Sequence, residues 1–96
     1  MAEERILTRH PSGKRGVNIS KKKYDMIRTS ILHCLERNDL TYEEIVGCVA
    51  GEVKDRFEGS LRWYCEAVKL DLEANGLLER IAIGKKTVYR MRWSGH

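Results

Sequence analysis

A chain of 96 residues, 42% hydrophobic and 33% charged, has the size and composition of one small globular domain. No apolar run approaches the roughly 20 residues that span a bilayer, and the N-terminal sequence MAEERILTRH lacks the basic and apolar regions of a secretory signal. We therefore expect a cytoplasmic location and no membrane partner.

The formal charge of +4 is unevenly distributed along the chain. Residues 1–23 carry seven basic and two acidic side chains, and residues 79–96 carry five and one. The intervening residues 24–78 carry six basic and eleven acidic side chains. An acidic partner is therefore expected to meet the two ends of the chain before its central part.

The first 19 residues show no helical period and contain Pro11 within the cluster PSGKRG. This composition predicts a basic arm over residues 1–19, partly disordered, ahead of a folded domain over residues 20–96. Val17 and Ile19 alternate around a polar residue at the end of the arm, which predicts a short strand there.

Apolar residues then recur at helical spacing in three stretches. The helices are expected over residues 21–37, 42–54 and 60–75. Ser20 has the character of an N-cap for the first helix, and Thr41 with Glu44 forms a capping box for the second. Gly76 suits the left-handed residue that ends a helix, here the third.

Toward the C-terminus the apolar period changes from 3.6 to 2, which predicts a two-stranded hairpin. A three-residue turn at 84–86 would place Ile81 opposite Tyr89 and gather most large apolar side chains on one face. A two-residue turn would pair Ile81 with Val88 and turn Tyr89 outward. We expect the three-residue turn, which also places Arg80 opposite Arg90.

The cysteines Cys34, Cys48 and Cys65 each fall among apolar residues of a helical pattern, and none belongs to a CxxC pair. We expect three reduced, buried thiols. A zinc site would need a histidine close by. His33 adjoins Cys34, but adjacent residues of a helix point in different directions, and the other histidines lie near the termini. We expect no metal site.

The segment LDLEANGLLERIAIGKKTVYRMRW, in which a helix ends and runs into a basic hairpin, resembles the recognition helix and wing of winged helix-turn-helix proteins. The resemblance covers about residues 20–93. It implies a mainly α fold with a small β-hairpin (α+β), in which three helices precede a two-stranded wing. The segments HPSGKRGVNISKKKYDMIR and FEGSLRWYCEAVKLDLEANGLLER are similar to those of a small uncharacterised bacterial family with a winged-helix-like fold.

In the winged-helix superfamily the third helix enters a DNA major groove and the wing contacts the backbone or the minor groove. The resemblance therefore implies a nucleic-acid-binding module, such as a transcriptional regulator, with DNA as its partner. The candidate contacts are basic side chains of the first helix, the third helix and the wing: Lys21, Lys22, Lys23, Arg62, Lys69, Arg80, Lys85, Lys86, Arg90 and Arg92. One feature departs from the superfamily, because Glu66, Asp71 and Glu73 make the third helix net negative.

Two of these basic clusters also have a structural interpretation. Lys21–Lys23 is also consistent with a solvated run of charge at the start of a helix. The basic residues of the hairpin would also protect an exposed sheet edge from aggregation.

A second apolar stripe on the third helix consists of Trp63, Ala67, Leu70 and Ala74, which recur at helical spacing away from the core stripe. A helix that is apolar on two sides is either covered on both or meets a partner. One interpretation is that the arm or the hairpin covers Trp63. The alternative is a protein-interaction module that reuses the fold and forms a homodimer through this stripe without binding DNA.

No pattern of catalytic residues appears in the chain. Ser20, Thr41 and Ser60 are explained as helix caps, and Glu43 and Glu44 favour the positive end of a helix dipole. No glycine-rich phosphate loop follows a strand. We expect no enzymatic activity and no small-molecule cofactor.

Overall fold

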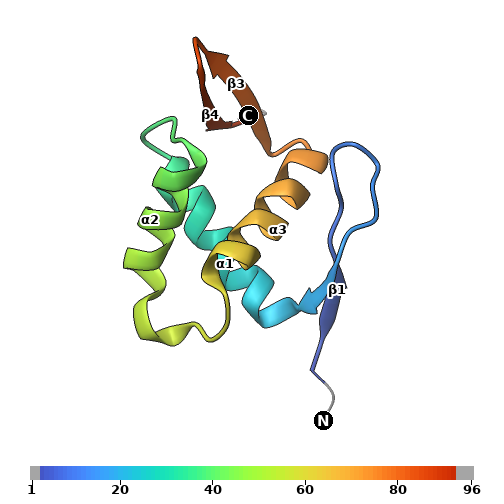
Figure 1. Ribbon diagram of the computed structural model, residues 1–96. Coiled ribbons are helices and arrows are strands. Elements are labelled where there is room, and N and C mark those ends of the chain that lie inside the picture. The colour runs from blue at the N-terminus through green and yellow to red at the C-terminus, as the bar shows by residue number, and fades with distance from the viewer. Residues whose placement is uncertain (1–2, 93–96) are drawn as a thin grey trace.

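Three helices form the centre of the fold, and an antiparallel hairpin lies toward each end of the chain (Figure 1). The computed structural model describes residues 3–92. The elements in chain order are β1 (Arg5–Leu7), β2 (Asn18–Ser20), α1 (Lys21–Leu35), α2 (Tyr42–Val53), the short 3-10 helix η1 (Lys54–Arg56), α3 (Leu61–Ala74), β3 (Leu78–Ile83) and β4 (Lys86–Met91). The three helices lie within three residues of their predicted bounds, and the α+β class is confirmed.

Each helix begins at the cap that the sequence predicts. The Ser20 hydroxyl accepts a hydrogen bond from the Lys23 backbone N–H at the start of α1. At α2, Thr41 and Glu44 form the complete capping box, with bonds of 3.2 and 2.8 Å. The C-terminal end of α3 is followed by Gly76 at φ 77°, the left-handed conformation that favours glycine.

The hydrophobic core lies between the three helices. Its buried members include Ile27, Ile31, Leu35, Ile45, Val49, Val68, Leu72 and Tyr89. Leu61 and Leu77 are partly buried and pack against this core, and Ile81 is also partly buried. Ile19 of β2 and Leu78 of β3 join the core and attach both hairpins to the helices.

The C-terminal hairpin, residues 78–91, does not have the predicted register. Ile83 pairs with Lys86 around a two-residue turn, and Ile81 pairs with Val88. Gly84 adopts φ 62°, as the left-handed turns of two-residue hairpins require. The prediction assumed one apolar face, whereas large apolar side chains lie on both faces of this hairpin. Ile83, at the tip of this hairpin, is therefore exposed.

This register also corrects the predicted opposition of two arginines. Arg80 lies opposite Tyr89, and Arg90 lies opposite Glu79. Tyr89 stays buried because the backbone of β4 is bridged to Leu40, in the connection between α1 and α2. The Tyr89 N–H donates to the Leu40 carbonyl at 2.7 Å, and the Leu40 N–H donates back at 3.2 Å. The bridge fixes the hairpin to the helices.

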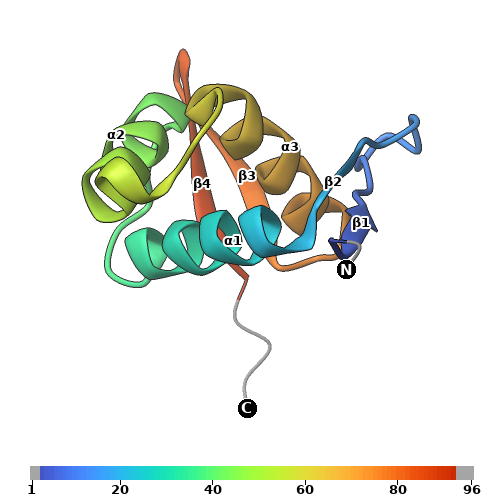
Figure 2. The same cartoon turned by 90° about the horizontal axis from the view of Figure 1, so that it is seen from below.

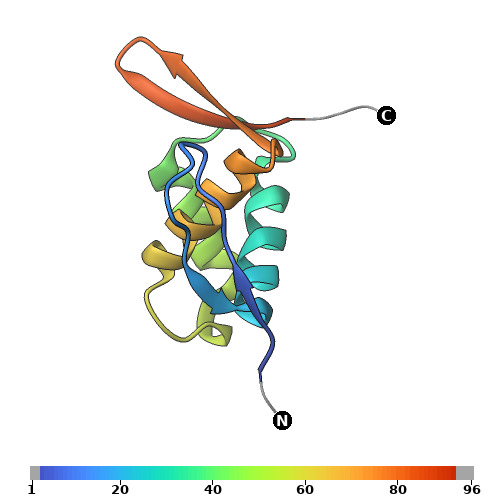
Figure 3. The same ribbon diagram turned by 90° about the vertical axis from the view of Figure 1, so that its right-hand side faces the viewer.

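The predicted basic arm contains a second hairpin, the arm hairpin (residues 5–20), which lies alongside the helices (Figure 3). Ile6 pairs with Ile19, and the predicted strand around Ile19 is confirmed as β2. Beyond the strands, the Thr8 N–H donates to the Val17 carbonyl at 2.9 Å. A Cβ atom at Gly16 would lie 1.7 Å from the Thr8 carbonyl oxygen, so this close approach requires glycine.

The expectation of three reduced thiols was wrong, because Cys34 of α1 and Cys48 of α2 form a disulfide. Their Cα atoms lie 6.2 Å apart, within the range that a disulfide bridges. The two helices present these residues to each other, which the separation of 14 in the sequence does not reveal. Cys65 is a free buried thiol, as predicted, and burial raises its pKa to about 11.

Within residues 3–92, no helix is long and apolar enough to cross a membrane.

Reduction of the Cys34–Cys48 disulfide is expected to lower the free energy of unfolding by about 2–4 kcal/mol, since the cross-link limits the conformations of the unfolded chain. Urea unfolding with and without dithiothreitol measures this difference. The control is the variant Cys34→Ala/Cys48→Ala, which keeps Cys65 and should unfold identically in both conditions. Equal midpoints for the unmodified chain with and without reductant would contradict the prediction.

Candidate nucleic-acid interface

A buried carboxylate on α3 fixes the arm hairpin in place. Asp71 is 3% exposed and accepts hydrogen bonds from the Arg9 backbone N–H at 2.7 Å and from the Asn75 side-chain amide at 3.0 Å. The Tyr24 hydroxyl of α1 donates to the same carboxylate. Burial and this bond raise the pKa of Tyr24 to about 12, so the tyrosine remains a donor at neutral pH. Asp71 thus joins α1, α3 and the arm hairpin.

A second carboxylate of α3 fixes the C-terminal hairpin. Glu73 pairs with Lys69 at 2.7 Å and with Arg80 of β3 at 3.2 Å. Lys69 is 2% exposed, and its ammonium lies 4.5 Å from the centre of the Tyr89 ring. This ammonium is buried in an internal ion pair, which disfavours the predicted contact of Lys69 with nucleic acid. The helical pattern of the sequence does not distinguish an exposed lysine from one that is buried in a pair with the acid four residues later.

The two hairpins lie on either side of α3 (Figure 2), and their strands β1, β2 and β4 also contact α1. The turn of the C-terminal hairpin points away from α1, whereas the loop of the arm hairpin extends to the other side of α3 (Figure 2). Figure 3 shows that the arm lies along the helices, with its loop toward the end that carries the C-terminal hairpin. The exposed residues of α3 are Arg62, Trp63 and Glu66, in the first half of the helix.

The basic residues of the C-terminal hairpin differ in their partners. Arg80 is paired with Glu73, and Arg90 is paired with Asp39 at 2.7 Å. The hydrogen bond from Arg90 lowers the pKa of Asp39. Lys85 and Lys86 are exposed at the turn and form no ion pair within the described part of the chain, and the same holds for Arg92 just after β4. The unpaired charge of this hairpin therefore lies mainly at its tip.

The loop of the arm hairpin carries basic residues that the predicted contacts omit. Arg9, Lys14 and Arg15 are exposed, and none of them forms an ion pair within residues 3–92. The excess of basic residues before residue 24 is the sequence feature that could have identified these residues as candidate contacts. Their placement beside α3 depends on the Asp71 hydrogen bond, which the sequence does not reveal.

The lysines at the start of α1 lie apart from this face. In Figure 1 the first turn of α1 lies at the opposite end of the helices from the C-terminal hairpin. Lys21 pairs with Asp25 at 2.8 Å, a typical i,i+4 surface pair. The Lys23 ammonium lies 5.2 Å from the centre of the Tyr64 ring. Lys22 remains exposed. The structure therefore does not bring these lysines together with the basic hairpin tips.

At the N-terminal end of α3, Arg62 is also paired. Its guanidinium donates two hydrogen bonds to Glu43 of α2, at 2.7 and 2.8 Å. This bidentate bond lowers the pKa of Glu43. A nucleic-acid contact by Arg62 would have to replace an existing carboxylate partner.

The second apolar stripe of α3 lies partly beneath the arm hairpin. Ala67 is buried, Leu70 and Ala74 are half-buried, and Trp63 is 46% exposed. A cavity of 170 Å³ lies between the stripe and the arm. Its lining residues are Thr8, Arg9, His10, Arg15, Gly16, Val17, Trp63, Glu66, Ala67 and Leu70. The arm thus covers much of the stripe and leaves an aromatic side chain at the edge of a cavity.

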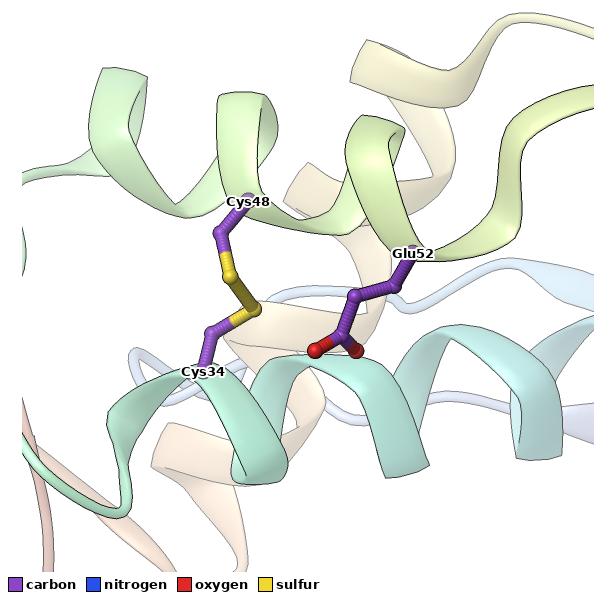
Figure 4. A group of neighbouring side chains, drawn as sticks. All are labelled: Cys34, Cys48 and Glu52. Atoms are coloured by element: carbon purple, nitrogen blue, oxygen red, sulfur yellow. A yellow bond between two sulfur atoms is a disulfide. The ribbon is translucent and has the colours of Figure 1, made fainter.

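Three potential metal ligands gather between α1 and α2, where Cys34, Cys48 and Glu52 offer atoms within 4.8 Å of one another (Figure 4). Both sulfur atoms belong to the disulfide, so neither is a thiolate that could bind a metal ion. The Glu52 carboxylate accepts a hydrogen bond from the Ser30 hydroxyl at 2.7 Å and contacts His33 Nδ1 at 2.5 Å. The disulfide and these hydrogen bonds account for the proximity of the three residues. The expectation of no metal site remains a prediction.

A family model described as a family of unknown function (DUF6958) matches residues 5–89, so the chain belongs to that family. No curated protein and no solved structure matches the chain. The matched region includes both hairpins and all three helices.

Replacing Asp71 with alanine is expected to lower the free energy of unfolding by about 1–3 kcal/mol, because the buried Tyr24 hydroxyl and two partly buried donors lose their acceptor. Amide exchange in residues 5–20 should also accelerate as the arm hairpin detaches. Hydrogen exchange followed by NMR measures both effects. Asp25→Asn removes an exposed surface pair and should cost less than about 1 kcal/mol. Unchanged protection of the arm amides in the Asp71 variant would contradict this role.

Proposed function

We propose that this member of the DUF6958 family is a winged-helix module that binds nucleic acid with α3 and the two basic hairpins beside it. The observation that carries the proposal is the position of the unpaired basic residues. Lys85 and Lys86 lie at one hairpin tip, and Arg9, Lys14 and Arg15 lie in the other loop. The two loops lie on the two sides of α3 (Figure 2).

The order of elements supports the winged-helix part of this proposal. Three helices precede the C-terminal hairpin, which is the arrangement that the resemblance implies. The bridge between Leu40 and Tyr89 holds this hairpin against the helices. In such an arrangement the hairpin and the third helix can contact one duplex together.

The acidic side chains of α3 should repel phosphate less than the net charge of the helix implies. Asp71 is buried and hydrogen-bonded, and the Glu73 side chain is 8% exposed and paired with two cations. Their charges are thus used inside the molecule, and Glu66 is the exposed acid that α3 retains. Phosphates approaching the hairpin tips would meet unpaired lysine and arginine side chains, which supply most nucleic-acid affinity.

The pairing of Arg62 and the burial of Lys69 favour recognition of the phosphate backbone over reading of bases. Phosphate contacts fix position and orientation but carry no sequence information. We therefore expect affinity that depends steeply on salt and weakly on sequence. The role of a sequence-specific transcriptional regulator is correspondingly less well supported than general nucleic-acid binding.

A dimerisation module is the second candidate, and the exposure of Trp63 is the observation that favours it. The arm hairpin covers much of the remaining stripe, since Ala67 is buried and Leu70 is half-buried. A stable interface buries about 800 Å² on each partner, far more than one half-exposed tryptophan provides. The basic hairpin tips therefore favour nucleic acid as the partner.

The variant Lys85→Gln/Lys86→Gln tests the proposed function. Binding should weaken similarly for duplexes of any sequence, and the slope of log K against log salt should shrink by about 0.9 for each lost phosphate contact. Fluorescence anisotropy with labelled duplexes over a series of salt concentrations measures both quantities.

The matched control is Lys21→Gln/Lys22→Gln, which removes the same charge at the start of α1. It should leave affinity close to that of the unmodified protein. Equal weakening by both variants would show that net charge, and not the hairpin tip, governs binding. Folded protein without salt-sensitive binding at low ionic strength would refute the proposed function.

A further inference from the structure

We infer that the cavity between the arm hairpin and α3 binds one unpaired base of a single-stranded nucleic acid, stacked on Trp63, while Arg9 and Arg15 contact the adjoining phosphates. This inference rests on the proposed function and adds a specific ligand to it. It distinguishes a site for single strands from the two hairpin tips, which would contact the backbone of any nucleic acid.

The size of the cavity suits one ring system. Its volume of 170 Å³ is below the roughly 300–1,000 Å³ of pockets that enclose whole cofactors or drug-sized ligands. The small residues Ala67 and Gly16 line the cavity together with the larger Trp63 and Leu70. Such a cavity fits a flat group that enters from outside while the rest of its chain remains in solvent.

Trp63 is placed as a stacking platform at this cavity. This residue is 46% exposed and lines the cavity. The indole packs against the Tyr64 ring with centroids 5.0 Å apart and an interplanar angle of 82°, which limits its rotation. Aromatic side chains in single-strand binding proteins stack bases without strong sequence preference, because every base has a π face.

Charge complementarity selects a nucleic acid over an apolar peptide as the occupant. Arg9, His10 and Arg15 line the cavity from the arm, against one acidic residue, Glu66. Within the described chain neither Arg9 nor Arg15 forms an ion pair. An apolar side chain would gain nothing from two unpaired guanidinium groups, whereas phosphates flanking a stacked base would neutralise them. The Asp71 hydrogen bond to the Arg9 N–H holds this part of the arm beside α3.

The test uses the variant Trp93→Phe, which leaves Trp63 as the single tryptophan of the full chain. This protein is titrated at low salt with an oligothymidylate of about eight nucleotides, within the usual site size of one small domain. An abasic oligomer of equal length carries the same phosphates without bases. The oligothymidylate should quench Trp63 fluorescence and bind about fivefold or more tightly than the abasic oligomer.

Two further variants assign the contacts. Trp63→Ala should bind both oligomers with equal affinity, as measured by anisotropy, because the stacking platform is lost. Arg9→Gln/Arg15→Gln should weaken the binding of both oligomers, whereas Lys21→Gln/Lys22→Gln should not. Thermal melting of each variant shows that it is folded, and the quenching measurement does not depend on these variants.

The outcomes separate this inference from the proposed function. Equal affinity for both oligomers without quenching would overturn the base site while leaving backbone binding intact. Binding to duplex but to neither single strand would also overturn it. Failure to bind any nucleic acid would overturn both proposals. A dimer that sedimentation shows to depend on Trp63 would assign the cavity to a second copy of the chain and overturn the inference.

Discussion

The position of the arm hairpin beside α3 depends on one buried carboxylate, that of Asp71. A carboxylate that is 3% exposed is costly unless donors surround it, and here they come from the arm hairpin, from α1 and from α3 itself. Satisfying Asp71 therefore requires the arm to lie along α3. The positions of Arg9 and Arg15, and the cavity beside Trp63, follow from that requirement. Glu73 has the equivalent function for the C-terminal hairpin, through Lys69 and Arg80. Residues two positions apart on a helix point to different sides, which allows two acids of one turn to hold two hairpins on opposite flanks.

The same contacts determine which charges are available to a partner. Asp71 and Glu73 of α3, which would repel phosphate, are engaged in contacts within the chain, and the cations Lys69, Arg80 and Arg90 each have an acidic partner in the chain. The unpaired basic residues that remain near α3 lie at the two protruding loops. In the sequence, the charge distribution shows an acidic central region and basic ends. In the fold, the basic ends form two loops that flank α3. Pairing, more than net charge, explains why the loops and not the exposed surface of α3 are the proposed contacts for phosphate.

Local signals predicted the helices well, and long-range contacts explain the errors. Ser20, Thr41 and Ser60 each cap a helix where the sequence places one, because capping depends on residues only three apart. The register of the C-terminal hairpin was mispredicted because Val88 and Tyr89 are both buried, on opposite faces, so alternation did not determine the turn. The Cys34–Cys48 disulfide depends on how α1 packs on α2, and the position of the arm depends on a hydrogen bond from Arg9 to a residue 62 positions away. Neither contact leaves a periodic signal in the sequence.

The most direct measurement of the central claim is an NMR titration of the labelled protein with a short duplex at low salt, followed by backbone amide shifts. The account predicts that the largest shifts fall in the arm loop (residues 8–17), in the turn of the C-terminal hairpin (residues 84–87) and along the exposed side of α3. Amides in the first turn of α1 should stay unchanged, since that turn lies at the other end of the molecule. Shifts concentrated in the first turn of α1, or no shifts on adding duplex, would contradict the account.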